Sequence, residues 1–346
     1  MVKEVKKAIE KLFSRQFGEY PEHISNLPHS GSERQYYRLK GATNCAIGVY
    51  NPDRKENKTF LYMTRFFLEE NIPVPQIYQY DHSKNIYLLQ DLGDQTLFSI
   101  ITDRQKAPVD EKGLTVLLKN VIKELVRIQI VAGKKFDFSK CYPYKEFNRS
   151  SIIYDLEYFR EQFLERINLQ YNKKQLQVDF RKLTDFINTA DKEYFMYRDF
   201  QSRNIMVHNE RLYFIDYQGG RKGPLQYDLA SLLFQARARI PEHIREDVLE
   251  YYISLARMLT PVSRDEFLQH YYAIALIRVL QTLGAYGLKG LKEQKEHFIQ
   301  SIPFALGNLD MISEKNIILG QLPELNRIIS ILQNLNLSNN GIKQKT

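Results

Sequence analysis

The sequence predicts a two-lobed α+β protein, with an antiparallel sheet and a helix in the N-terminal lobe and a mainly helical C-terminal lobe. Short apolar runs separated by turn residues occur in the first 90 residues, a pattern typical of strands. Longer stretches with helical spacing of apolar residues dominate further on. A chain of 346 residues, 43% of them apolar, can form two cores. We expect lobes at residues 1–91 and 92–337 and a disordered tail at 338–346.

The chain begins with a predicted amphipathic helix, followed by a turn that could bind an anion. Apolar residues at positions 5, 9, 12 and 13 fall at helical spacing, so this helix should pack against a neighbouring lobe. Gly31 and Ser32 then precede a strand-like run at 34–39. Small residues let backbone N–H groups approach a phosphate closely. An ordinary hairpin turn explains the same residues equally well.

The remaining N-terminal elements follow in a regular order. Cys45 to Tyr50 reads as a strand, and a helix with one apolar face starts near Glu56 and ends near Asn71. A proline-containing turn at 71–77 leads into the next strand, and another strand is expected at 85–90. Asp91-Leu92-Gly93-Asp94 should form the break between the lobes.

The second half of the chain reads as helices that flank one short hairpin. Helices are predicted at 114–131 and at 151–169, the latter with Ser150 or Ser151 as its N-cap. A hairpin is predicted from 205–208 and 212–215, with its turn at 209–210. Further helices should continue to about residue 335.

Three oxygen-bearing side chains surround this hairpin and carry the chemistry. Asp199 follows an apolar strand-like approach, Asn204 comes five residues later, and Asp216 ends the hairpin. We expect them to converge on one side of it. Phosphoryl transfer requires a carboxylate that orients the attacking hydroxyl and hard oxygen ligands that hold Mg²⁺ against the phosphates. Asp199 would orient or deprotonate the hydroxyl, and Asn204 and Asp216 would hold the metal.

These motifs resemble a known family. Arg198-Asp199, then Asn204, then Asp216 twelve residues further on, is similar to the catalytic and metal signature of the protein-kinase-like fold. The surrounding segments 198–204 and 227–230 look most like the aminoglycoside phosphotransferase and choline kinase superfamily. Within it they resemble the bacterial branch of N-acetylmuramate and N-acetylglucosamine kinases. The resemblance implies transfer of the ATP γ-phosphoryl group to a hydroxyl, with Mg²⁺ as cofactor.

The resemblance also implies roles for residues of the first lobe. The turn at Gly31 and Ser32 would cover the nucleotide, the Gln90 carbonyl and the Leu92 N–H would bind the adenine, and Glu56 would orient the phosphate contact. A solvated acid in the first turn of a helix is an equally good interpretation of Glu56. The family's third-strand lysine is absent from Cys45–Tyr50. The basic residues that could replace it are Arg34, Arg38 and Lys40.

The acceptor is expected to be a small molecule. Eleven residues separate Asp216 from Asp228, and no Ala-Pro-Glu triplet occurs, whereas a protein kinase needs a longer segment to bind a peptide. By family position, the residues that could contact an acidic sugar are Arg149, Tyr154, Arg160 and Arg203. Asp228 would support the catalytic loop, and Tyr197 replaces the histidine common at the start of the motif.

The composition of the chain argues against nucleic-acid binding and against insertion into a membrane. The formal net charge is +8, and the Lys and Arg residues are spread along the chain and interleaved with 41 acidic residues. This distribution fits a protein that binds an anionic nucleotide better than one that binds nucleic acid. No apolar stretch is long enough to span a membrane, and the two separated cysteines suit a reducing cytosol, so we expect a cytoplasmic protein. The oligomeric state is not predicted. Two alternatives stay open: a kinase of another alcohol, such as an aminoglycoside or choline, and a non-catalytic nucleotide-binding regulator.

Overall fold

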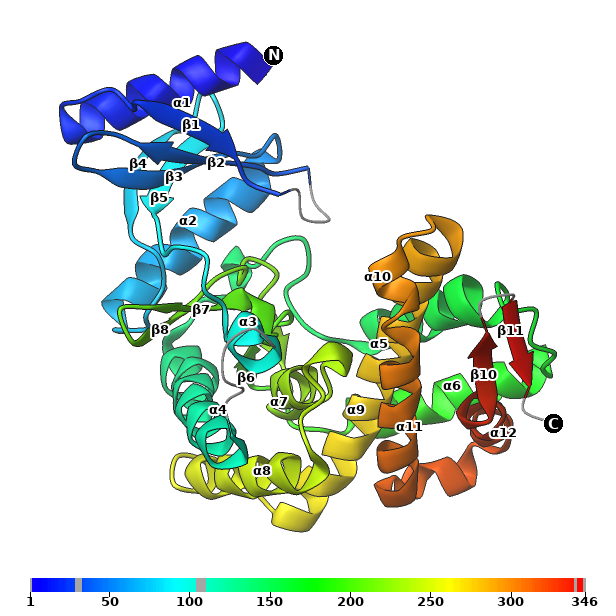
Figure 1. Cartoon of the computed structure of the whole chain (residues 1–346). Coiled ribbons are helices and arrows are strands. Elements are labelled where there is room, and N and C mark those ends of the chain that lie inside the picture. The colour runs from blue at the N-terminus through cyan, green and yellow to red at the C-terminus, as the bar shows by residue number, and fades with distance from the viewer. Residues whose placement is uncertain (1, 29–32, 104–109, 339–340, 345–346) are drawn as a thin grey trace. The chain divides into compact units, whose positions relative to one another are not determined.

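The computed structural model describes residues 2–28, 33–103, 110–338 and 341–344, and Figure 1 shows their helices and strands. The chain packs as two compact units. Unit 1 comprises Met1–Ile100, Phe136–Lys145 and Arg203–Gly220, and unit 2 comprises Ile101–Lys135, Glu146–Ser202 and Arg221–Thr346. Unit 1 therefore includes two segments from far along the chain. The division into lobes at residue 91 remains a prediction.

The centre of unit 1 is an antiparallel five-stranded sheet with the order β1-β2-β3-β5-β4. The predicted strands form at nearly their expected positions, and β1 is a strand that the sequence did not indicate. The strands are β1 (His23–Asn26), β2 (Gln35–Lys40), β3 (Cys45–Tyr50), β4 (Ile77–Asp81) and β5 (Ile86–Gln90).

Two helices pack against opposite faces of this sheet. Helix α1 (Val2–Phe17) buries Ile9 and Phe13 in one cluster with Ile86 and Leu88 of β5. It approaches β3 closely, because a Cβ at Gly48 would lie 2.4 Å from Cγ2 of Ile9. Successive strand residues face opposite sides, so Tyr87 faces away from α1 and stacks on Phe60 of α2 (Arg54–Glu69), with ring centroids 5.1 Å apart.

Helix α2 starts and stops through its own polar residues. The Asp53 carboxylate accepts hydrogen bonds from the N–H groups of Lys55 and Glu56, which fixes the first turn. Asn71 adopts a left-handed φ of 56°, in agreement with its predicted role as a stop signal. The capped first turn places Glu56 at a defined position beside the sheet.

The predicted hairpin is present in unit 1. Strands β7 (Ile205–His208) and β8 (Arg211–Phe214) pair antiparallel, and the turn residues Asn209 and Glu210 both have positive φ, as a type I′ turn requires. The Phe214 N–H donates to the Pro73 carbonyl at 2.8 Å. The hairpin is thereby bonded to the segment that follows α2.

Unit 2 is mainly helical, and α9 (Arg264–Tyr286) is its central helix, packed against α5, α7 and α11. The predicted N-cap of α5 is wrong, because the side chain of Asn148 caps this helix and accepts the Ser151 N–H at 3.1 Å. Two short strands, β6 (Tyr194–Met196) and β9 (Arg221–Gly223), pair antiparallel. The other helices are α3 (Leu97–Thr102, which spans the boundary between the units), α4 (Glu111–Val126), α5 (Arg149–Phe159), α6 (Lys173–Asn188), α7 (Gln226–Leu233), α8 (Glu242–Arg257), α10 (Glu296–Ile299), α11 (Ile302–Lys315) and α12 (Pro323–Gln333).

The C-terminal end contains two short paired strands, β10 (Leu335–Ser338) and β11 (Gly341–Gln344). The tail predicted at 338–346 overlaps this hairpin. Of the helices in the described ranges, none combines the length and the apolar character needed to cross a membrane.

Candidate active site

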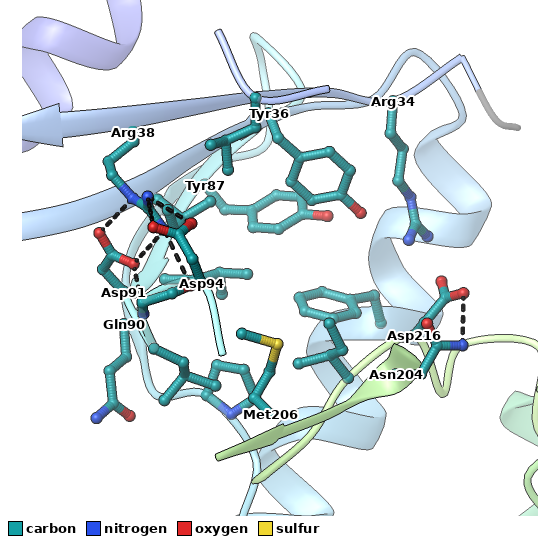
Figure 2. A pocket seen from close by; sticks show the side chains of 18 of the residues that line it. Arg34, Tyr36, Arg38, Tyr87, Gln90, Asp91, Asp94, Asn204, Met206 and Asp216 are labelled. Carbon is teal, nitrogen blue, oxygen red and sulfur yellow. Dashed lines mark hydrogen bonds and ion pairs between the residues drawn. The ribbon is translucent and has the colours of Figure 1, made fainter. Parts of the chain in front are cut away.

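A cavity of about 360 Å³ lies within unit 1 (Figure 2). One side is the face of the sheet that α1 does not cover, and the lining is completed by the segment 90–94 (the hinge), by α2 and by the hairpin. Most of the lining is apolar, while charged and amide side chains gather at its ends, which is typical of a small-molecule site. The lining residues include Arg34, Tyr36, Arg38, Phe60, Tyr87, Gln90, Asp91, Leu92, Asp94, Asn204, Met206, Asp216 and Gln218.

Strand alternation explains which basic residue faces the inner part of the cavity. Arg34, just before β2, lies two residues from Tyr36, and both side chains point into the cavity in Figure 2. Tyr36 pairs with Val49 of β3, and Val49 pairs with Tyr87 of β5. On this face of the sheet, Val49 of β3 thus lies between Tyr36 and Tyr87. The basic residue is Arg34, which precedes the neighbouring strand β2.

Arg34 is paired with the predicted helix acid. Its side chain is 3% exposed, and Nη2 lies 3.1 Å from Oε1 of Glu56. The other carboxylate oxygen of Glu56 accepts a hydrogen bond from the Asn51 side chain at 2.7 Å. Burial opposes the charge, but Tyr87, Tyr36 and Glu56 outweigh it and raise the pKa of Arg34 above its usual value. A permanent positive charge is therefore held at the cavity wall.

Arg38 and Lys40, the two other predicted candidates, are placed differently. Arg38 binds the hinge: Nε lies 2.7 Å from Asp91, Nη1 lies 2.7 Å from Asp94, and Nη2 donates to the Gly93 carbonyl at 3.0 Å. Arg38 on β2 therefore reaches past the neighbouring strand β3 to the hinge, which follows β5, and its guanidinium is engaged there. Lys40 is exposed at the far end of β2, opposite Cys45. Of the three basic residues, Arg34 has the contacts expected of the missing lysine.

The hinge residues Gln90 and Leu92 both line the cavity. The Gln90 N–H donates to the Gln76 carbonyl at 2.9 Å, which fixes the end of β5. The Leu92 carbonyl lies 3.2 Å from Nδ1 of His208 on β7, a contact that sequence reasoning missed. The backbone roles in adenine binding remain predictions. Gly31 and Ser32 lie outside the described residues.

Asn204 and Asp216 are brought together at the base of the hairpin. The Ile215 N–H donates to the Asn204 carbonyl at 3.0 Å, which extends the pairing of β7 and β8. The Asn204 amide then lies 3.4 Å from Oδ2 of Asp216 (Figure 2), and Asp216 adopts a left-handed φ of 69°. Carboxylate and amide oxygens are the hard ligands that Mg²⁺ prefers. The donor set therefore fits the predicted metal.

The loop that carries Asp199 belongs to unit 2 and is held by Asp228 in the first turn of α7. The two oxygens of Asp228 accept the N–H of Tyr197 at 2.7 Å and the N–H of Arg198 at 2.9 Å. Gln129 donates to the same carboxylate at 2.8 Å. Arg198 has a left-handed φ of 81°, a strained conformation for a side chain of this size. The bonds to Asp228 stabilise that backbone immediately before Asp199.

Asp228→Asn should therefore destabilise unit 2 and reduce activity. The asparagine would direct an N–H₂ group at N–H donors, and loss of a hydrogen bond to a buried charge costs about 1.5–3 kcal/mol. Urea unfolding would measure the change, with Asp265→Ala, at an 88% exposed side chain, as the control. An unchanged free energy of unfolding would contradict the supporting role of Asp228.

Two side chains complete the loop. Tyr197 is buried and packs edge-on against Phe200, with ring centroids 5.2 Å apart. The tyrosine ring therefore fills the position at which the family commonly has a histidine. The Arg198 guanidinium contacts the buried Asp155 carboxylate of α5 at 3.2 Å and the Tyr227 hydroxyl. Asp155, which sequence reasoning missed, ties α5 to the loop.

The predicted acceptor residues lie on two units. Arg149 and Tyr154 are on α5, where Arg149 pairs with Asp185 and Tyr154 is 69% exposed and stacks on Tyr158. Arg203 is exposed and belongs to unit 1. Arg160 is bound by Glu157, Glu161 and Glu165. Contact with a sugar remains a prediction for all four residues, Arg149, Tyr154, Arg160 and Arg203.

Comparison with known proteins decides the family. Residues 23–262 match the sequence profile described as the phosphotransferase enzyme family, which covers more than half of the chain. The chain belongs to the phosphotransferase enzyme family. It is accordingly a phosphotransferase that uses an alcohol group as acceptor.

The phosphotransferase is similar to two curated relatives along most of its length. Both are named N-acetylmuramate/N-acetylglucosamine kinase. The protein from Neisseria meningitidis serogroup B is 25% identical, over 86% of this chain and 88% of the relative. The one from Pseudomonas aeruginosa is 22% identical, over 88% of each.

Solved structures confirm the predicted two-lobed kinase-like fold of the phosphotransferase. A choline kinase from Streptococcus pneumoniae superposes with a TM-score of 0.57 at 16% identity, covering 89% of this chain and 99% of that one. An ADP-bound aminoglycoside phosphotransferase, APH(2'')-Ib, gives 0.57 at 14% identity, covering 90% and 97%. At these identities the likeness concerns the fold.

Proposed function

We propose that the phosphotransferase transfers the γ-phosphoryl group of ATP to a hydroxyl of an N-acetylated amino sugar, at the anomeric position. The observation that carries the proposal is one cavity in unit 1 that is lined by Arg34, the partner of Glu56, and by Asn204 and Asp216, whose side chains are in contact. The names of the Neisseria and Pseudomonas relatives support the sugar as acceptor.

The apolar part of the cavity suits a purine. Ile47 and Leu89 of the sheet and Met206 of the hairpin line it, and they can enclose a flat ring. The Gln90 carbonyl and the Leu92 N–H would provide the polar contacts at the hinge. Arg34 would then bind the phosphates, because a guanidinium held by Glu56 offers donors in a fixed orientation. ATP as donor also suits the predicted cytoplasmic location.

Asn204 and Asp216 would hold Mg²⁺, which, when bound, neutralises charge on the phosphate oxygens. Asp199, only five residues before Asn204 in the sequence, would orient the sugar hydroxyl and accept its proton. The bond between the hydroxyl oxygen and the γ-phosphorus forms as the bond to the β-phosphate oxygen breaks. ADP and the sugar phosphate are the products.

The acceptor panel is the test of this function. We expect Mg²⁺-dependent ADP release from ATP to rise with N-acetylmuramate or N-acetylglucosamine and to stay at background with choline and aminoglycosides. Other hexoses in the same panel show whether the N-acetyl group is required. Turnover only with choline or an aminoglycoside would contradict the sugar assignment. ATP binding without turnover on any acceptor would favour the regulatory alternative.

A further inference from the structure

Gln218, two residues after Asp216, has a side-chain oxygen with an unusual environment. Its Nε2 donates to Oδ1 of Asp216 at 2.7 Å. Its Oε1 is buried and has no hydrogen-bond partner among the described residues. Because the nitrogen is committed to the carboxylate, the orientation of the amide is fixed. Buried polar atoms are normally satisfied, so this oxygen calls for a partner that arrives from outside the chain.

Gln218 lines the same cavity as Asn204 and Asp216. The Asp216 carboxylate contacts both amides, since Nδ2 of Asn204 lies 3.4 Å from Oδ2 and Nε2 of Gln218 lies 2.7 Å from Oδ1. These three side chains together carry a single formal negative charge. A divalent cation is held weakly by one carboxylate and two amides, and it needs further anionic oxygens, such as those of phosphates.

We propose that Oε1 of Gln218 is a further oxygen ligand for the divalent cation, and that this donor set of low charge binds the cation together with a nucleoside diphosphate or triphosphate rather than alone. The inference rests on the proposed function, which assigns the cation to Asn204 and Asp216. It adds one residue, Gln218, to that site.

Direct binding of Mn²⁺ tests the proposal without reference to turnover. Free Mn²⁺ is measured by electron paramagnetic resonance with and without ADP, and ADP binding is measured by calorimetry with and without Mn²⁺. Wild type should bind Mn²⁺ at least tenfold more tightly with ADP present. Gln218→Met should weaken that binding about 10–100-fold, the range seen when a residue supporting a metal site is changed. Its affinity for ADP without metal should be unchanged.

Gln218→Glu separates a ligand from a residue that only positions Asp216. Glutamate retains an oxygen and adds a negative charge, but it cannot donate to Asp216. If Gln218 is a ligand, the variant should bind Mn²⁺ more tightly than wild type in the absence of ADP. If the amide only positions Asp216, the variant should behave like Gln218→Met, and the proposal is wrong. Gln79→Met on β4 is the matched control, and melting temperatures check that all variants fold.

The outcomes distinguish this inference from the proposed function. Equal binding of Mn²⁺ and ADP by Gln218→Met and wild type would contradict the inference alone. Tight binding of Mn²⁺ by wild type without ADP would contradict the predicted dependence on nucleotide. Failure of wild type to bind any nucleotide would contradict the proposed function, and the inference with it.

Discussion

Asp199→Ala should remove acceptor-dependent ADP release, with kcat reduced about 10²–10⁴-fold, the usual contribution of a positioned general base. The carboxylate follows a backbone segment that Asp228 holds through two N–H groups, so its own position is restricted. The variant should bind ADP as wild type does, because the residues predicted to bind the nucleotide belong to unit 1, whereas Asp199 belongs to unit 2. Turnover is measured with the most active acceptor of the panel.

Asp199→Asn sharpens this experiment, since it keeps the shape and removes the ability to accept a proton. We expect both variants to be similarly impaired. Asp265→Ala, at an exposed position on α9, should leave kcat unchanged. Activity of Asp199→Ala within tenfold of wild type would exclude Asp199 as the base.

Local sequence patterns predicted the elements around the site well. The apolar run Cys45–Tyr50, the apolar face and stop signal of α2 and the polar turn at Asn209 are local signals, and each element formed close to the expected bounds. The N-cap of α5 was misplaced because asparagine and serine are both good caps, and Asn148, which also favours this position, lies just before the two serines. Strand β1 was missed because its short segment depends on pairing with β2, which is a tertiary contact.

The candidate site was predicted less completely, because register and side-chain direction decide it. Arg34, Arg38 and Lys40 have the same charge within seven residues. Their roles separate only when β2 is placed: Arg38 reaches Asp91 and Asp94 of the hinge, and Lys40 is left at the sheet end. Gln218 could have been noticed as an amide two residues after a predicted metal ligand. Its buried oxygen, however, is visible only in three dimensions.

Arg34→Met should reduce kcat about 10²–10³-fold, as expected for loss of one group that stabilises charge in the transition state. Arg34 is almost fully buried, is paired with Glu56 and shares a cavity with Asp216. Arg34→Lys should recover part of the activity, because the charge is kept while the two-pronged geometry of the guanidinium is lost. Arg65→Met, at an exposed position on α2, is the control and should have wild-type kcat.

Comparison of adenosine with ADP shows whether Arg34 acts on the phosphates or only supports the cavity wall. A phosphate contact predicts that Arg34→Met loses affinity for ADP and ATP but binds adenosine as wild type does. A supporting role predicts equal losses of affinity for adenosine, ADP and ATP, since Arg34 also lies over the Phe60 ring at 5.9 Å.

Val49→Lys in the Arg34→Met background adds a second criterion. Val49 lies between Tyr36 and Tyr87 on the third strand, where the family resemblance places the lysine, so partial recovery of ADP affinity would show that Arg34 performs the lysine's function from the neighbouring strand.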